Sequence, residues 1–290
     1  MITAAGFFSG VGGLELGIMD EGVEVLQSLD LDKDATDCLS MNLPSHNVQR
    51  ADIKTVTVSE QPETDVILGT YPCTKYSPIA DIHGTRTGDD LYLHFFRMMA
   101  IRRPEMYVLE NVPGMKKFPV VMEAMTKLPD YYVNVVCPVD AENWLPQRRK
   151  RLIIFGSKKP FFISHPSASA NRPSIMDIVD KEADILPPQY ALNRIDGNGK
   201  YRDRPIIVDA DCPNAIAPTC VAHYSKDQST RMLKVNGKIR PFTVREYARL
   251  QGFPDWFRFP EKKSSYRLIG NAVPVPMGRW VGQQIKRYFN

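Results

Sequence analysis

Short apolar runs alternate with segments of helical periodicity through roughly the first half of the chain. The runs that we predict as strands are Ile2–Phe8, Val23–Leu29, Val66–Leu68, Met106–Leu109, Val133–Cys137 and Leu152–Phe155. Between them, apolar residues recur at helical spacing in Leu14–Glu21, Ala35–Met41, Leu91–Arg102 and Val120–Leu128. Strands that alternate with helices are typical of a parallel sheet with crossover connections, so the pattern predicts an α/β fold.

The pattern changes twice towards the C-terminus. The Val133 and Leu152 runs are too close together for a crossover helix, so we expect an antiparallel pair at the sheet edge. From about Pro160 to about Lys238, Pro, Asn, Asp and Gly are frequent, which predicts a second, irregular module. Helical spacing returns in Thr243–Gln251, with Thr243 as the expected N-cap, and in an amphipathic Val275–Phe289 helix expected to return to the first domain.

Composition narrows the class of protein. At 290 residues, with 43% hydrophobic and 24% charged residues, the chain has the make-up of an ordinary soluble globular protein. A net charge of +4 permits a polyanionic partner without demanding one. Five cysteines without zinc-ligand spacing argue against a disulfide framework and a structural metal. We find neither a membrane-spanning stretch nor a basic leader, so we expect a cytoplasmic protein.

The first candidate site is a glycine-rich turn. Phe8-Ser9-Gly10-Val11-Gly12-Gly13 joins a predicted strand to a predicted helix, where glycines let a backbone approach a ligand closely. A tight turn without a ligand would have the same sequence. Asp30, at the end of the second strand, favours a ligand, because a carboxylate there can accept ribose hydroxyls. Asp52 is a further acid at a loop edge, and taken alone it would be interpreted as a solvated turn residue.

The second candidate is Cys73, which follows Pro72 just after the third predicted strand. A lone cysteine is usually a small buried hydrophobe. Here the thiol would project at the ligand-binding edge of the sheet. The stretch that follows contains Gly84, Gly88 and several basic residues, which suits a loop that closes over an anionic ligand.

An acid and a basic run complete the set. Glu110 ends an apolar strand, where a partly desolvated carboxyl could share a proton; the alternative is a Glu that caps the next turn. The run Gln147-Arg148-Arg149-Lys150-Arg151 would by default be a solvated face. Because Arg149 and Arg151 alternate into the strand that follows, we expect both on one face, placed to hold a ligand.

In this order the motifs resemble those of the DNA cytosine-5 methyltransferase family, over nearly the whole chain except the irregular module. The matching segments are the glycine loop, Pro72-Cys73 with Ser77, Glu110-Asn111-Val112, Gln147–Arg151, Thr243–Pro254 and Gly270–Pro276. The resemblance implies a Rossmann-like S-adenosylmethionine-dependent methyltransferase sheet with helices on both faces. Residues 1–160, completed by 261–290, would form the catalytic domain, and 161–260 a target-recognition domain and hinge.

The resemblance also implies an activity. A methyl group would pass from S-adenosyl-L-methionine to C5 of a flipped-out cytosine in a specific duplex DNA sequence, through a covalent bond between Cys73 and C6. S-adenosyl-L-homocysteine would be the product, with no metal, no membrane and a monomeric enzyme on double-stranded DNA. The residues implied as catalytic are Cys73, Glu110, Arg149 and Arg151. Those implied to bind the methyl donor are Phe8, Gly10, Gly12, Gly13, Asp30, Asp52, Leu91, Asn271 and Val273. Those implied to contact DNA are Lys75, Ser77, Arg86, Arg202, Lys226 and Arg231.

Two departures and three alternatives remain open. Thr74 replaces the family's usual Gln, and Gly69-Thr70-Tyr71 replaces its usual Gly-Gly followed by Pro or Phe, but the nucleophile is kept. The tRNA-directed branch of the family typically has a Cys-Phe-Thr stretch that is absent here. A catalytically idle DNA-binding relative would not need all three of Cys73, Glu110 and Arg151. A nicotinamide-dependent enzyme with a thiol nucleophile leaves the Gly270–Pro276 motif unexplained.

Overall fold

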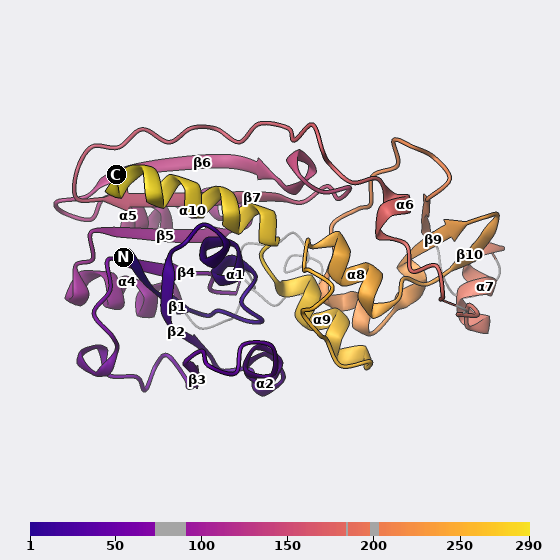
Figure 1. The fold of residues 1–290 in the computed structure, drawn as a ribbon, viewed down its shortest axis with the longest axis horizontal. Coiled ribbons are helices and arrows are strands. Elements are labelled where there is room, and N and C mark those ends of the chain that lie inside the picture. Colours follow the sequence, from indigo (N-terminus) through magenta and orange to yellow (C-terminus); the bar gives the residue numbers. More distant parts are fainter. Residues whose placement is uncertain (73–90, 184, 198–202) are drawn as a thin grey trace. The chain divides into compact units, whose positions relative to one another are not determined.

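The structure is a computed structural model that describes residues 1–72, 91–183, 185–197 and 203–290. The chain forms two compact units (Figure 1). The first unit consists of Met1–Asp140, Lys150–Pro166 and Met277–Asn290. The second consists of Ala141–Arg149 and Ser167–Pro276. The division into catalytic and target-recognition domains at the boundaries given above stays a prediction.

A seven-stranded sheet forms the centre of the first unit. Its strands are β1 (Thr3–Phe7), β2 (Glu24–Asp30), β3 (Val48–Arg50), β4 (Val66–Gly69), β5 (Met106–Asn111), β6 (Tyr132–Asp140) and β7 (Lys150–Ser157). They lie in the order β3-β2-β1-β4-β5-β7-β6. The first five pair in parallel, whereas β7 runs antiparallel to both β5 and β6. The predicted strands and the antiparallel edge pair are confirmed, while the short edge strand β3 was not predicted.

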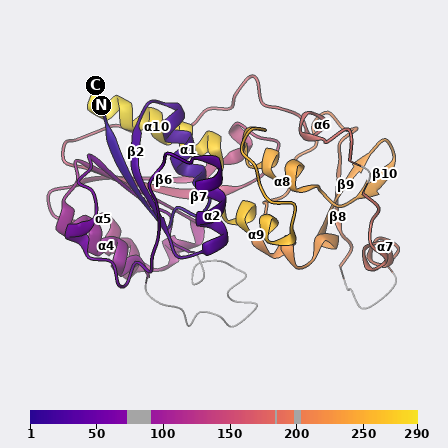
Figure 2. The same ribbon diagram turned by 60° about the horizontal axis from the view of Figure 1, so that its bottom comes forward.

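Helices cover both faces of this sheet, as the sequence predicted. They are α1 (Gly13–Asp20), α2 (Lys33–Asn42), α4 (Leu91–Arg102), α5 (Pro119–Thr126) and α10 (Val275–Phe289). Within the first unit, Figures 1 and 2 show α4 and α5 on one face and α1 and α10 on the other. Successive side chains of β7 point to opposite faces of the sheet, so they pack against different helix layers. Ile154 joins the core with Phe95 and Met125 of α4 and α5, whereas the ring of Phe155 packs 5.6 Å from that of Trp280 on α10.

The last helix packs directly on the first. A Cβ built on Gly278 of α10 would lie 2.7 Å from the carbonyl oxygen of Leu14 on α1, so only glycine permits this approach. Residues from Met277 onward belong to the first unit. The expected return of the C-terminal helix to the first domain is therefore confirmed.

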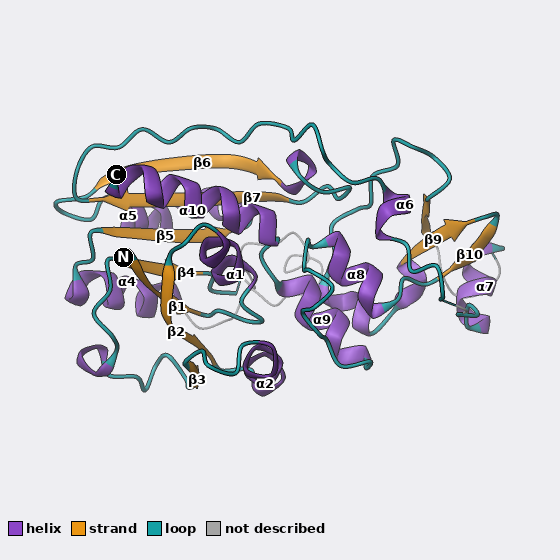
Figure 3. Ribbon diagram, viewed as in Figure 1, coloured by secondary structure: helices purple, strands orange, loops and turns teal. Residues whose placement is uncertain are grey.

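The second unit contains short elements joined by long loops (Figure 3). They are α6 (Ile175–Ile178), α7 (Gln189–Ile195), β8 (Ile206–Asp209), β9 (Arg231–Val235), β10 (Lys238–Arg240), α8 (Val244–Leu250) and α9 (Lys263–Asn271). Thr243 caps α8 in a reciprocal capping box with Glu246, which confirms the predicted helix start. The three-stranded β10-β9-β8 sheet was not predicted, because strands of three to five residues rich in charged side chains leave little periodic signal.

Candidate active site

The backbone conformation of the glycine loop allows a ligand to approach closely. Phe8, Gly10 and Gly12 have φ angles of 63°, 57° and 75°, in the left-handed region. A Cβ at Gly10 would meet no described atom within 4 Å, whereas one at Gly12 would lie 2.8 Å from the side chain of Leu39 on α2. Gly12 is therefore needed for packing, and Gly10 presents open backbone on which a ligand could lie.

Asp30 ties this loop to the end of β2. Its Oδ2 accepts a hydrogen bond from the Gly10 N–H at 2.7 Å, and its Oδ1 accepts one from the Asp32 N–H at 2.8 Å. Burial raises the pKa of Asp30, and these backbone hydrogen bonds partly offset the rise. The two carboxylate oxygens together have four lone pairs, so Asp30 keeps capacity to accept a hydroxyl donor beside its backbone hydrogen bonds from Gly10, Leu31 and Asp32. The carboxylate therefore fits the ribose of a nucleoside ligand.

Asp52 lies close to Asp30 along the same sheet edge. It follows β3, which pairs with β2, and the Ala51 N–H donates to the Asp30 carbonyl oxygen at 3.1 Å. The Asp52 carboxylate itself accepts the Lys54 N–H at 3.0 Å and so closes a turn. Arg97 of α4 fixes the loop beyond by donating to the carbonyl oxygens of Ile53 and Val56. Leu91, the first residue of α4, is half-buried and packs against the core of this unit.

The chain is held firmly up to Tyr71, two positions before the predicted nucleophile. Thr70 donates its hydroxyl to the Phe8 carbonyl oxygen at 2.7 Å, which joins the end of β4 to the glycine loop. Tyr71 is buried, and its carbonyl oxygen accepts from Asn111 Nδ2 at 3.1 Å. Cys73 follows two positions later. The predicted site residues Cys73, Lys75, Ser77, Arg86 and Arg202 lie outside the described residues.

Glu110 and Arg151, predicted separately, are brought together. Arg151 Nε lies 2.8 Å from Glu110 Oε1, and their side chains are only 12% and 10% exposed. Glu110 is near the end of β5 and Arg151 near the start of β7, strands that pair antiparallel. A guanidinium so placed holds the carboxyl in one orientation and offsets the cost of burying its charge.

Arg149 does not lie on a strand face with Arg151, which contradicts the prediction from the sequence. It precedes β7 and belongs to the second unit, where its guanidinium donates to the carbonyl oxygens of Cys220, Gly270 and Ala272 at 2.7, 3.0 and 2.8 Å. The expectation was wrong because alternation applies only within a strand, and β7 begins at Lys150. Arg149 thus anchors the segment that carries the Gly270–Pro276 motif.

The remaining predicted residues lie in the second unit. Asn271 is exposed at the end of α9, and Val273 is buried just beyond it. Lys226 is exposed, whereas Arg231 is partly buried at the start of β9 and reaches Thr230 Oγ1 at 3.3 Å.

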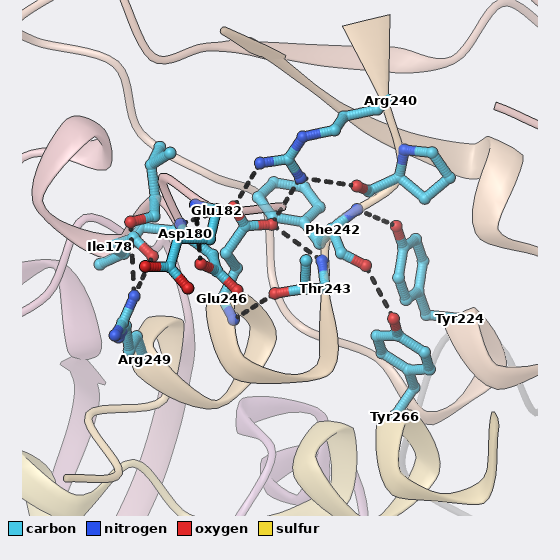
Figure 4. A network of polar contacts seen from close by, with 12 residues as sticks. Ile178, Asp180, Glu182, Tyr224, Arg240, Phe242, Thr243, Glu246, Arg249 and Tyr266 are labelled. Atoms are coloured by element: carbon cyan, nitrogen blue, oxygen red, sulfur yellow. Dashed lines mark hydrogen bonds and ion pairs between the residues drawn. The ribbon is translucent and has the colours of Figure 1, made fainter. Parts of the chain in front are cut away.

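A buried ion pair organises the second unit (Figure 4). Glu246 of α8 is fully buried, and its two oxygens accept from Arg240 Nη1 and Nη2 at 2.8 and 2.6 Å. The same carboxylate accepts the backbone N–H groups of Thr243 and Asp180 at 2.8 and 2.9 Å. These four hydrogen bonds use all acceptor sites of the carboxylate, and they join β10, α8 and the loop after α6. The sequence did not identify Glu246 as a structural centre.

Sequence analysis also missed Glu15. This residue is in the first turn of α1 and is completely buried. Burial raises the pKa of Glu15 to about 7, and the nearby Asp30 carboxylate adds to the rise. The available signal in the sequence was its position within Gly13–Ile18, where Glu15 is the one polar side chain in a run of glycine and apolar residues. The structure buries this segment on every side. An acid in such a segment has no solvated face to occupy.

Two further observations concern the described residues alone. No group of three or more His, Cys, Asp or Glu side chains is placed to hold a metal ion among them. Within the same ranges, no helix combines the length and the apolar character needed to cross a bilayer.

Comparisons with known proteins identify the family of the chain. The sequence profile described as C-5 cytosine-specific DNA methylase matches residues 2–205 and 200–287. The chain is 27% identical over 339 residues to the type II methyltransferase M.Sau96I of Staphylococcus aureus, covering 98% of this chain and 75% of that protein. It is 29% identical over 301 residues to the type II methyltransferase M.BsuFI of Bacillus subtilis, covering 98% and 72%.

Solved structures show the same fold. The Entamoeba histolytica methyltransferase EhMeth superposes with a TM-score of 0.82 at 18% identity, covering 100% of this chain and 99% of that one. The S. pombe Dnmt2 methyltransferase superposes with a TM-score of 0.78 at 16% identity, covering 99% of both chains. The predicted fold class and family resemblance are confirmed, and the chain belongs to the C-5 cytosine-specific DNA methylase family.

Proposed function

We propose that this chain transfers a methyl group from S-adenosyl-L-methionine to C5 of a cytosine in a specific duplex DNA sequence, acting as a monomer through a covalent bond between Cys73 and C6. The observation that carries this proposal is the buried ion pair of Glu110 with Arg151. The next residue, Asn111, holds the carbonyl of Tyr71 two positions before Cys73. An acid with a fixed orientation and a thiol nucleophile are what addition to a pyrimidine ring requires.

The chemistry explains both groups. C5 of cytosine is too weak a nucleophile to take a methyl group unaided, but addition of the Cys73 thiolate to C6 makes C5 enamine-like. Glu110 would hydrogen-bond N3 and share a proton with it, so that negative charge does not accumulate on the ring. Arg151 would keep Glu110 oriented and contact the O2 edge of the base. After methylation a base takes the C5 proton, and the electron pair of that C–H bond restores the C5–C6 double bond and expels the Cys73 thiolate.

The methyl donor would bind along the glycine loop. S-adenosylmethionine, when bound, would supply an electrophilic methyl group. Asp30 would accept the ribose hydroxyls and Asp52 would contact the adenine, while Phe8 and Gly10 would lie against the donor. The free acceptor sites of Asp30 and the open backbone at Gly10 support this assignment. The further contacts that we propose come from Gly12, Gly13, Leu91, Asn271 and Val273.

The DNA would be read by the second unit and by the segment after Cys73. A stacked cytosine cannot be attacked at C6, so the target base must be flipped out at a cost of a few kcal/mol. Basic and polar side chains would hold the phosphate backbone around the flipped base. Those that we propose for this role are Lys75, Ser77, Arg86, Arg202, Lys226 and Arg231.

Trapping with 5-fluorocytosine tests the covalent step. Fluorine at C5 cannot leave as a proton does, so duplexes carrying it at the target site should become crosslinked to the wild-type enzyme in the presence of the donor. Bisulfite sequencing of DNA from expressing cells first identifies that site. Cys73→Ala should abolish methyl transfer and crosslinking while donor binding persists. Methylation of plain duplexes without any crosslink to fluorinated ones would refute the covalent mechanism, and methylation of tRNA alone would refute the DNA substrate.

A further inference from the structure

Glu15 and Ser9 form a buried polar pair that the proposed chemistry does not use. Glu15 is in the first turn of α1, and Ser9 belongs to the glycine loop. Both residues are buried, and neither Glu15 Oε2 nor Ser9 Oγ makes a hydrogen bond of ordinary geometry among the described residues, although the Ser9 hydroxyl is near enough to the carboxyl to lower its pKa slightly. Buried polar atoms without a partner are uncommon because their desolvation is not offset.

The backbone of β1 makes room for this pair. A Cβ built on Gly6 would overlap the Glu15 carboxyl and would lie 2.6 Å from Ser9 Oγ. Because Gly6 has no side chain, the carboxyl can lie against the strand, next to the first residues of the loop. The site is thus built from the strand, the helix and the loop together.

No described cation neutralises the carboxyl. The charged residues on α1 and its neighbours β2, α2 and α10, with their capping residues, are Asp20, Glu21, Glu24, Asp30, Asp32, Lys33, Asp34, Asp37, Arg279, Lys286 and Arg287. Lys33 is exposed and paired with Asp37 of its own helix. Arg279 is paired with Asp20 at the opposite end of α1. Asp30 is the charged neighbour that acts on Glu15, and its negative charge adds to the effect of burial in raising the Glu15 pKa. Glu15 therefore changes its charge near neutral pH, beside a loop with a second acid.

We propose that Glu15 is a charge-tuning residue whose carboxylate favours the cationic methyl donor over the neutral product. This inference rests on the proposed function, since it takes the glycine loop as the donor site. S-adenosylmethionine carries a sulfonium charge that S-adenosylhomocysteine lacks, and the two ligands are otherwise alike apart from the methyl group. A buried carboxylate beside the loop attracts the sulfonium and has no such effect on the thioether.

The proposal predicts a specific pH dependence. As pH rises and Glu15 loses its proton, affinity for the donor should rise relative to affinity for the product. The amino and carboxylate groups common to both ligands cancel in this ratio. From the screened attraction of one buried charge, we expect the ratio to increase about three- to tenfold between about pH 6 and about pH 8.5. Donor binding near pH 7 should also release protons, and product binding should release fewer.

Calorimetric titration of the whole 290-residue chain tests this without turnover. Both ligands are titrated into wild type, Glu15→Gln and the control Glu24→Gln across this pH range, in buffers of different ionisation enthalpy. Glu24 is exposed at the first residue of β2, so the same chemical change there leaves the pair intact. We expect the ratio to rise with pH in wild type and in Glu24→Gln, and to stay constant in Glu15→Gln.

Each outcome decides the proposal. A ratio independent of pH in wild type overturns it, as does an undiminished rise in Glu15→Gln. Because wild type alone gives the first result, the test holds even if Glu15→Gln does not fold. Binding of neither ligand overturns the proposed donor site as well, whereas binding of both with a constant ratio overturns only the role of Glu15.

Discussion

Arg151 Nε lies 2.8 Å from Glu110 Oε1, although the two residues are separated by a helix and a long strand in the sequence. The contact exists because β7 lies directly beside β5 and runs against it. A carboxyl oriented by a guanidinium in a largely buried position can take part in proton sharing without free rotation. Replacing Glu110 should therefore affect mainly catalysis, whereas replacing Arg151 should affect mainly stability.

Replacement of Glu110 by Gln should slow methyl transfer by at least about 100-fold, because the amide cannot share a proton with N3. Product binding should change by less than about twofold, since Glu110 is not among the proposed donor contacts. Single-turnover transfer of a labelled methyl group and calorimetry measure the two quantities. Glu123→Gln, an exposed change on α5, is the control. Near-wild-type turnover in Glu110→Gln would falsify the assigned role.

Replacement of Arg151 by Met should instead reveal the cost of an uncompensated carboxylate. Breaking a buried ion pair by removing one partner typically costs about 3 to 5 kcal/mol. We expect the lower end of this range, because both side chains keep slight exposure. Urea unfolding compares Arg151→Met with Glu110→Gln, which keeps a hydrogen-bond acceptor for the guanidinium and should lose less. Equal stability of the two variants would contradict this reasoning.

Thr70 tests the connection between the glycine loop and the strand that leads to Cys73. Its hydroxyl donates to the Phe8 carbonyl oxygen, so Thr70→Val should cost about 1 kcal/mol and weaken donor binding about fivefold. Thr70→Ser keeps the hydroxyl and should behave nearly as wild type. Calorimetric donor affinity and thermal unfolding of both variants provide the measurements. Similar donor affinity in the valine and serine variants would show that the hydrogen bond is not needed for the loop.

Glu15 should make the first unit less stable as pH rises. Its pKa is raised in the folded protein from an ordinary 4.5 to about 7, so the folded state binds the extra proton between these values. The penalty is absent below about pH 4.5, grows through this window and is complete above about pH 7, where it reaches about 3 kcal/mol. Stability of Glu15→Gln relative to wild type should therefore increase with pH, as urea unfolding at several pH values can measure. A constant difference from pH 5 to pH 8 is the contrary result.

The Arg240–Glu246 pair should be far more important to the second unit than an exposed pair of the same kind. Glu246→Ala leaves the buried guanidinium and the two N–H groups without their acceptor, which should cost about 3 to 5 kcal/mol. Asp255→Asn removes the mostly exposed partner of Arg249 and should cost less than about 1 kcal/mol. Thermal unfolding of both variants makes the comparison. Comparable losses would mean that burial does not decide the strength of these pairs.

Several elements follow from local sequence alone. The β1 and β2 strands and the helix Val275–Phe289 were predicted within a residue or two, because side-chain period and burial agree along them. The Thr243 cap was predicted because capping acts within one turn of helix. Glu110 and Arg151 were identified as candidates in the same way, each from its position beside an apolar run.

Only the tertiary structure decided what these residues contact. The pairing of β7 between β5 and β6 brings Arg151 to Glu110, while Arg149, two positions earlier, binds carbonyl groups of the second unit. The buried surroundings of Glu15 likewise depend on Gly6 and Asp30. Periodicity and capping are set by neighbours a few residues apart, so the sequence by itself determined the elements and the candidate chemistry. Ion pairing and desolvation depend on strands far apart in the chain, so they were decided by the fold.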